Sequence, residues 1–89
     1  MIRERLDITN PSGLDLAPAG LLCHTATRFL SRIEICCAEG NTINAKSILS
    51  VLGACAKCGD DIELICEGPD EEEAFLAISD LIKNGLGEK

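Results

Sequence analysis

The chain has 89 residues, the size of one small domain, and 46% of them are hydrophobic, which favours a packed core over a disordered chain. Its formal net charge of −7 disfavours binding to nucleic acid or to an anionic membrane, because both need basic surfaces. No apolar run reaches the roughly 20 residues of a transmembrane helix, and the opening MIRER lacks the apolar core of a signal peptide. We therefore expect a cytoplasmic protein with a single domain over residues 1–89.

The first half of the chain predicts a strand, a helix and a hairpin. Apolar residues alternate with charged ones over 2–8, which is typical of a half-buried strand, and the turn-forming residues 10–13 end it. Asp15 is a good N-cap for a helix over 16–27. Alternation resumes over 32–38, and 39–41 predicts a hairpin turn into a short strand over 41–44.

The second half predicts a short helix, a strand and a longer helix. Ser47 is the expected N-cap of a helix over 48–52, in which Leu49 and Leu52 are expected to face the core. Alternation from residue 60 to residue 66 predicts a strand that turns Ile65 outward. Asp70 is expected to cap the last helix, with Glu73 at the capping-box position.

The resulting order, β-α-β-β-α-β-α, favours an α+β open-faced sandwich. In this fold class, a four-stranded antiparallel sheet is covered on one face by three helices. The sequence contains neither a nucleophile–base pair nor a Gly-rich phosphate loop, so we do not expect an enzyme.

Six cysteines in so short a chain would suggest a disulfide scaffold in a secreted protein. In a cytoplasmic protein we expect reduced thiols that pack as small apolar side chains. The alternative is a thiol or metal-binding module built on Cys55 and Cys58, whose C-x-x-C spacing suits half a zinc site or a redox pair. No second pair has that spacing, so no metal or other cofactor is expected.

Two segments, NPSGLDLAPA at 10–19 and NAKSIL at 44–49, resemble the HPr family in their residues and in the order of elements around them. HPr is the histidine-containing phosphocarrier of the bacterial phosphoenolpyruvate-dependent sugar phosphotransferase system. The resemblance covers nearly the whole chain. Matches to the family's two motifs, Gly-Leu-His-x-Arg-Pro-Ala and Lys-Ser-Ile/Leu, are Gly13, Leu14, Pro18, Ala19, Lys46, Ser47 and Ile48.

The departures from the family fall on the residues that carry its chemistry. Asp15 stands at the position of the phosphoryl-accepting His, and Ala17 at that of the Arg that holds the phosphoryl group. A carrier needs a neutral imidazole as nucleophile and positive charge around its product. We therefore expect no phosphohistidine carrier but a regulatory or docking protein, with a phosphocarrier of atypical site as the alternative. Asp15 is either a helix cap alone or a mimic of the charged state of the site.

The resemblance also implies a regulatory site and a docking surface. Ser47 matches the serine that HPr kinase phosphorylates in the family, and some relatives that lack the His act as co-regulators after this modification. The implied partners are HPr kinase or a transcription regulator, with no direct contact to nucleic acid or membrane. Partner-binding positions between the first two helices are matched by Leu16, Gly20, Lys46 and Ile48.

Overall fold

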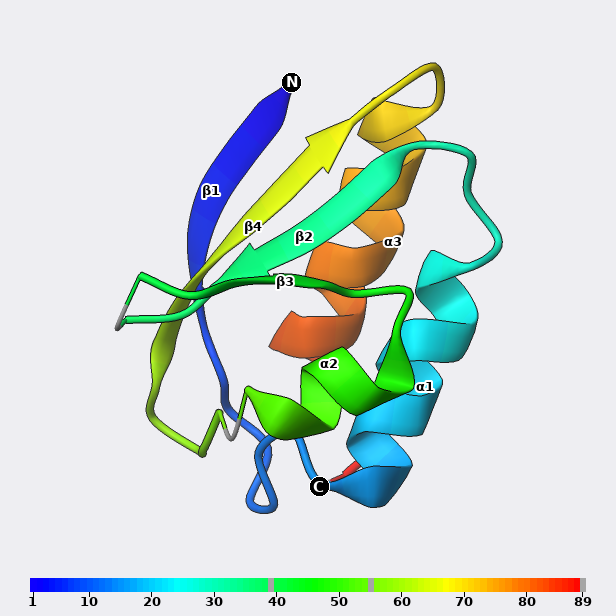
Figure 1. Ribbon diagram of the computed structural model, residues 1–89. Helices are drawn as coiled ribbons and strands as arrows, with labels where there is room; N and C mark the ends of the chain where they lie inside the picture. Colours follow the sequence, from blue (N-terminus) through cyan, green and yellow to red (C-terminus); the bar gives the residue numbers. More distant parts are fainter. Residues whose placement is uncertain (39, 55, 89) are drawn as a thin grey trace.

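A computed structural model describes residues 1–38, 40–54 and 56–88, and these form an open-faced α+β sandwich (Figure 1). In chain order the elements are β1 (Ile2–Asp7), α1 (Leu16–Ala26), β2 (Arg32–Cys36), β3 (Thr42–Asn44), α2 (Ile48–Gly53), β4 (Asp61–Glu67) and α3 (Glu71–Lys83). The strands pair antiparallel in the order β1-β4-β2-β3. The expected fold class and order of elements are thereby confirmed.

Alternation along the strands places one apolar face of the sheet under the helices. Leu6 of β1 lies opposite Ile62 of β4, and Ile35 of β2 lies opposite Leu64 of β4, so these side chains share one face. Each of them is at most 7% exposed. The helices contribute further fully buried residues to this core, which include Leu22, Val51, Ile78 and Ile82.

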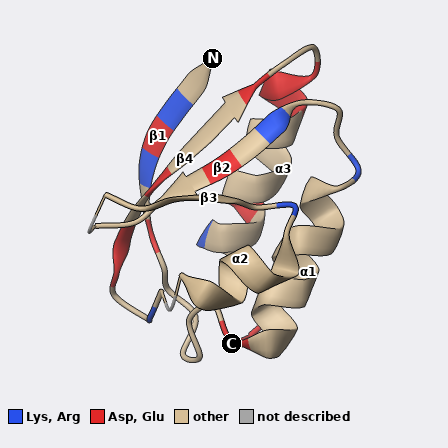
Figure 2. Cartoon of the chain, in the orientation of Figure 1, with Lys and Arg blue, Asp and Glu red and all other residues tan. Residues whose placement is uncertain are grey.

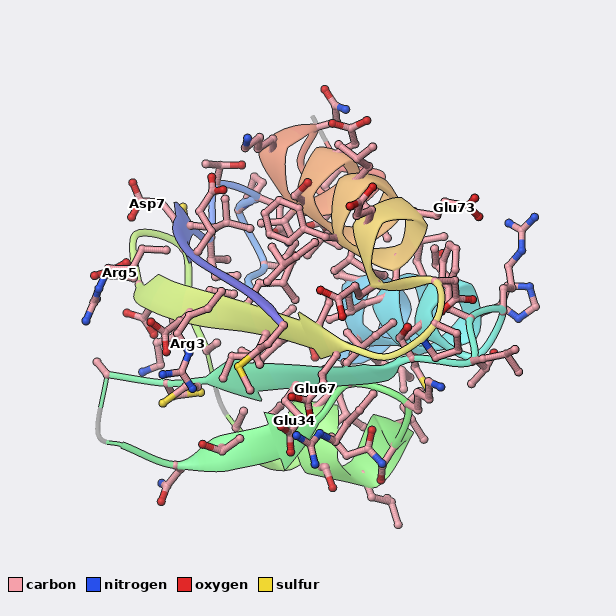
Figure 3. The ribbon with its side chains drawn as sticks, turned by 90° about the horizontal axis from the view of Figure 1, so that it is seen from above. Arg3, Arg5, Asp7, Glu34, Glu67 and Glu73 are labelled. Carbon is pink, nitrogen blue, oxygen red and sulfur yellow. The ribbon has the colours of Figure 1, made fainter. Side chains whose placement is uncertain are left out.

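The other face of the sheet carries charged side chains, and Figure 3 shows Arg3 and Arg5 extending from it, away from the helices. Arg3 Nε lies 3.4 Å from Glu63 Oε1, and Arg5 is paired with Asp61. Ile65 also belongs to this face, as expected, but it is only 5% exposed. Its neighbours across the strands are Arg3 and Glu34, whose aliphatic stems can cover an apolar side chain.

The prediction of a capping box at the start of α3 is wrong. Asp70 occupies the N-cap position, but among the described residues its side chain makes no cap hydrogen bond to its own helix. Its carboxylate accepts instead from the Ser31 hydroxyl, the Leu30 N–H and the Ser31 N–H. The Asp70 N–H, which Glu73 would accept in a capping box, donates to Ser31 Oγ at 3.1 Å. Glu71 accepts the Gly68 N–H at 3.2 Å. The acidic start of α3 therefore holds the α1–β2 loop in place. The hydrogen bonds to the Asp70 carboxylate, above all the one from the Ser31 hydroxyl, lower the pKa of Asp70.

Candidate functional site

The turn before α1 fixes where that helix begins. Gly13 has a φ of 63°, and a Cβ on it would stand 2.4 Å from the Ala56 carbonyl oxygen. Only glycine tolerates both conditions. The following residue, Leu14, is 3% exposed and donates its N–H to the same Ala56 oxygen at 2.9 Å. The α2–β4 connection thus holds the residue immediately before Asp15.

Asp15 caps α1, as its position in the sequence predicts. Its Oδ1 accepts the Leu16 N–H at 2.8 Å, and its carbonyl oxygen accepts the Ala19 N–H at 2.8 Å. Both Asp15 and Ala17 are exposed. A carboxylate therefore accepts a hydrogen bond from one of the free N–H groups at the start of the helix, where an anion is favoured.

Ser47 caps α2, also as predicted. Its Oγ accepts the Ser50 N–H at 3.4 Å, and its carbonyl oxygen accepts the Val51 N–H at 3.0 Å. The Ser47 N–H in turn donates to the carbonyl oxygen of Asn44 at 3.0 Å. Ser47 as a whole is half-buried.

Lys46 connects this turn to the far end of α1. Its Nζ donates to the Phe29 carbonyl oxygen at 2.6 Å, and its own carbonyl oxygen accepts the Cys23 thiol at 3.0 Å. The Lys46 N–H donates to Asn44 Oδ1 at 2.9 Å. The ammonium group, which we expected at the docking surface, is thus held by its own chain and helps to position Ser47.

Three of the expected docking residues lie together. Leu16 and Gly20 are four residues apart on α1 and share a face. A Cβ on Gly20 would stand 3.8 Å from Ile48 Cδ1 of α2. Leu16 is 65% exposed and Ile48 is 37% exposed.

Leu49 extends this surface, although the sequence pattern placed it in the core. It is 80% exposed, whereas Leu52 packs partly buried against the core as expected. We call Leu16, Gly20, Ile48 and Leu49 the α1–α2 patch. Figure 2 shows that neither helix carries a Lys, Arg, Asp or Glu, in contrast to the sheet and α3. The patch is therefore apolar and uncharged.

Two of the described cysteines, Cys66 and Cys58, lie in contrasting environments. Cys66 is buried, and burial raises the pKa of its thiol to about 11. Cys58 is exposed, and its thiol donates to the Thr9 carbonyl oxygen at 3.7 Å. Cys55, its partner in the expected C-x-x-C pair, lies outside the described residues. Within the described ranges, no group of three or more His, Cys, Asp and Glu side chains could hold a metal ion.

The capped start of α1 thus lies beside an exposed apolar patch in a small open-faced α+β domain. A family model described as "PTS HPr component phosphorylation site" matches residues 2–84. The chain is 37% identical to the phosphocarrier protein HPr of Treponema pallidum, over all of both chains. It is also 37% identical to the HPr-like protein Crh of Halalkalibacterium halodurans, over 88% of this chain and 92% of the relative.

The similarity to HPr proteins extends to the three-dimensional fold. The crystal structure of HPr-C-His from Thermoanaerobacter tengcongensis superposes with a TM-score of 0.94, with 37% identity over 100% of this chain and 99% of the other. The chain therefore belongs to the HPr family of the sugar phosphotransferase system, whose members are phosphocarrier and regulatory proteins and not enzymes. None of the described helices is long and apolar enough to span a membrane.

Proposed function

We propose that this chain is a regulatory, partner-docking member of the HPr family that does not carry a phosphohistidine. The observation that carries the proposal is the state of the first helix terminus. At the position of the phosphoryl-accepting His, the Asp15 carboxylate accepts the Leu16 N–H at 2.8 Å. An anionic donor would meet a negative charge there, and Ala17 supplies no guanidinium to balance a phosphoryl group.

The regulatory part of the proposal rests on Ser47. Its hydroxyl lies at the start of α2, directly before Ile48 of the α1–α2 patch. A phosphate on this oxygen would place about two negative charges between Lys46 and the apolar side chain of Ile48. A partner could thus read the phosphate and the neighbouring apolar side chains together. The likeness to Crh supports this role, since Crh of Bacillus subtilis is described as a catabolite repression HPr.

The chemistry of the α1–α2 patch indicates what kind of surface a partner presents. Exposed Leu16 and Leu49 suit an apolar contact in which a few large side chains supply most of the affinity. Because α1 and α2 carry no Lys, Arg, Asp or Glu, docking of the unmodified chain should depend weakly on salt. We infer that the partner is a cytoplasmic protein, HPr kinase or a transcription regulator, as the family resemblance implies.

Phosphorylation by a cognate HPr kinase tests the proposal. The chain is incubated with the kinase and labelled ATP, beside an ordinary HPr as positive control, and the modified peptide is mapped. Ser47→Ala should abolish labelling. Ser50→Ala, which removes another half-buried hydroxyl from the same helix, should leave labelling unchanged. Absence of label on the wild-type chain, with the ordinary HPr labelled, would remove Ser47 from the account.

A further inference from the structure

The segment after α3 folds back onto the start of α1. Leu86 is 2% exposed, with a φ of 51°, and its N–H donates to the Leu81 carbonyl oxygen at 2.9 Å. One residue further, a Cβ on Gly87 would stand 3.3 Å from Leu21 Cδ2 of α1. Figure 1 accordingly places the C-terminal end of the chain beside the first turn of α1.

The Glu88 carboxylate accepts hydrogen bonds from donors in the turn before α1. Its Oε1 accepts from Asn10 Nδ2 at 2.8 Å and from the Ser12 N–H at 3.1 Å, while its Oε2 accepts the Ser12 hydroxyl at 2.8 Å. All three donors are uncharged. The Asn10 hydrogen bond, followed by the two from Ser12, lowers the pKa of Glu88.

The hydrogen bond between Asn10 and Glu88 involves a buried side chain. The residue is 1% exposed, and its Nδ2 also donates to the Gly13 carbonyl oxygen at 2.7 Å. Without Glu88, one of the two N–H groups of this buried amide loses its acceptor, which is costly inside a protein. The same amide therefore links the tail to Gly13, two residues before Asp15.

We propose that residues 86–88 form a latch, in which the Glu88 carboxylate fills a cradle made by Asn10 and Ser12 and so holds the start of α1. Leu86 anchors the latch, and the part beyond it can open without unfolding the core. An open latch releases Ser12 and one N–H of the Asn10 amide in the turn before α1, and it moves Gly87 away from Leu21 of α1. The latch does not depend on Ser47 phosphorylation, so it can be tested separately from the proposed function.

NMR measurements on Glu88→Gln and Glu88→Ala test the latch, with Glu4→Gln as the matched control. Glu4 is an exposed carboxylate on β1 for which no hydrogen bond or ion pair is present within the described part of the chain. In both Glu88 variants the Ser12 amide should exchange about tenfold faster, as loss of one charge-assisted hydrogen bond implies. The order parameter of the Gly87 amide should fall from about 0.85 to below about 0.6.

The amides of β4 distinguish a latch from a general loss of stability. If the latch is local, exchange in β4 stays as in the wild type and Glu4→Gln changes nothing at Ser12 or Gly87. Ser12→Ala, which removes one donor from the cradle, should loosen Gly87 to an intermediate degree. The proposal is overturned if Ser12 and Gly87 are unchanged in Glu88→Ala, or if β4 exchange accelerates by the same factor as Ser12.

Discussion

Replacing Asp15 separates its role as a helix cap from its role as a negative charge. Asp15→Ala removes the acceptor for the Leu16 N–H, a hydrogen bond of 2.8 Å at an exposed helix terminus. Loss of such a cap costs about 1 kcal/mol of unfolding free energy. In a domain of this size, that loss lowers Tm by roughly 4–8 °C. Asp15→Asn keeps a capping oxygen and loses only the charge, so it should cost about 0.3 kcal/mol.

The assay is urea unfolding at pH 7, followed by far-UV circular dichroism because the chain has no Trp and no Tyr. A partner-binding measurement on the same variants completes the comparison. If Asp15 mimics the charged state, Asp15→Asn should weaken partner binding while the fold stays nearly as stable as the wild type. The cap assignment is refuted if Asp15→Ala unfolds at the wild-type urea midpoint, or if Asn costs as much as Ala.

The remaining predictions concern packing and pH. Leu49→Ala should change the free energy of unfolding by less than about 0.5 kcal/mol because the side chain is exposed. Val51→Ala, at a site with 0% exposure, should cost about 1.5–2.5 kcal/mol in the same urea assay. Equal costs would mean that α2 packs against the core through a different face. Burial raises the pKa of Cys66 from 9.0 to about 11, so the folded thiol keeps its proton longer than the unfolded one and stability should fall as pH rises from 9 to 11. The Cys66→Ser variant should flatten this alkaline slope, and an unchanged slope would contradict it. Hydrogen bonds lower the pKa of Asp70, so its contribution to stability should be complete above its ordinary value near about 4 and be lost as pH falls through the lower folded value. Asp70→Asn should reduce the acid slope of a pH–stability profile, and an equally steep slope in that variant would contradict the Ser31 contact.

Local patterns predicted the elements well because the signals are contained in a few neighbouring residues. Alternation identified the strands, and the N-caps Asp15 and Ser47 were recognisable because the capping atom and the amide it binds are at most three residues apart. Leu49 was misplaced for the opposite reason. A helix of six residues is too short for its periodicity to define one buried face, so only the packing against α1 and the sheet decides.

Contacts between distant segments lay beyond what a single sequence can reveal. The first-turn acids of α3 satisfied the local rule for a capping box, but Ser31 and Leu30, 39 and 40 residues earlier, compete for the Asp70 carboxylate. Glu88 and Ser12 are 76 residues apart, and nothing in either segment marks them as partners. The expected docking positions came from the family motif, whereas the exposure of Leu16 and Leu49 emerged only from the fold.

The most direct test of the central claim is phosphoryl transfer from the first enzyme of the phosphotransferase system. The chain is incubated with this enzyme and labelled phosphoenolpyruvate, beside an ordinary HPr. We predict no label on the wild-type chain and some label on the double variant Asp15→His with Ala17→Arg, which restores the nucleophile and the phosphate clamp. A labelled wild-type chain whose label is lost in Asp15→Ala would contradict the account and show a phosphocarrier that uses an aspartate.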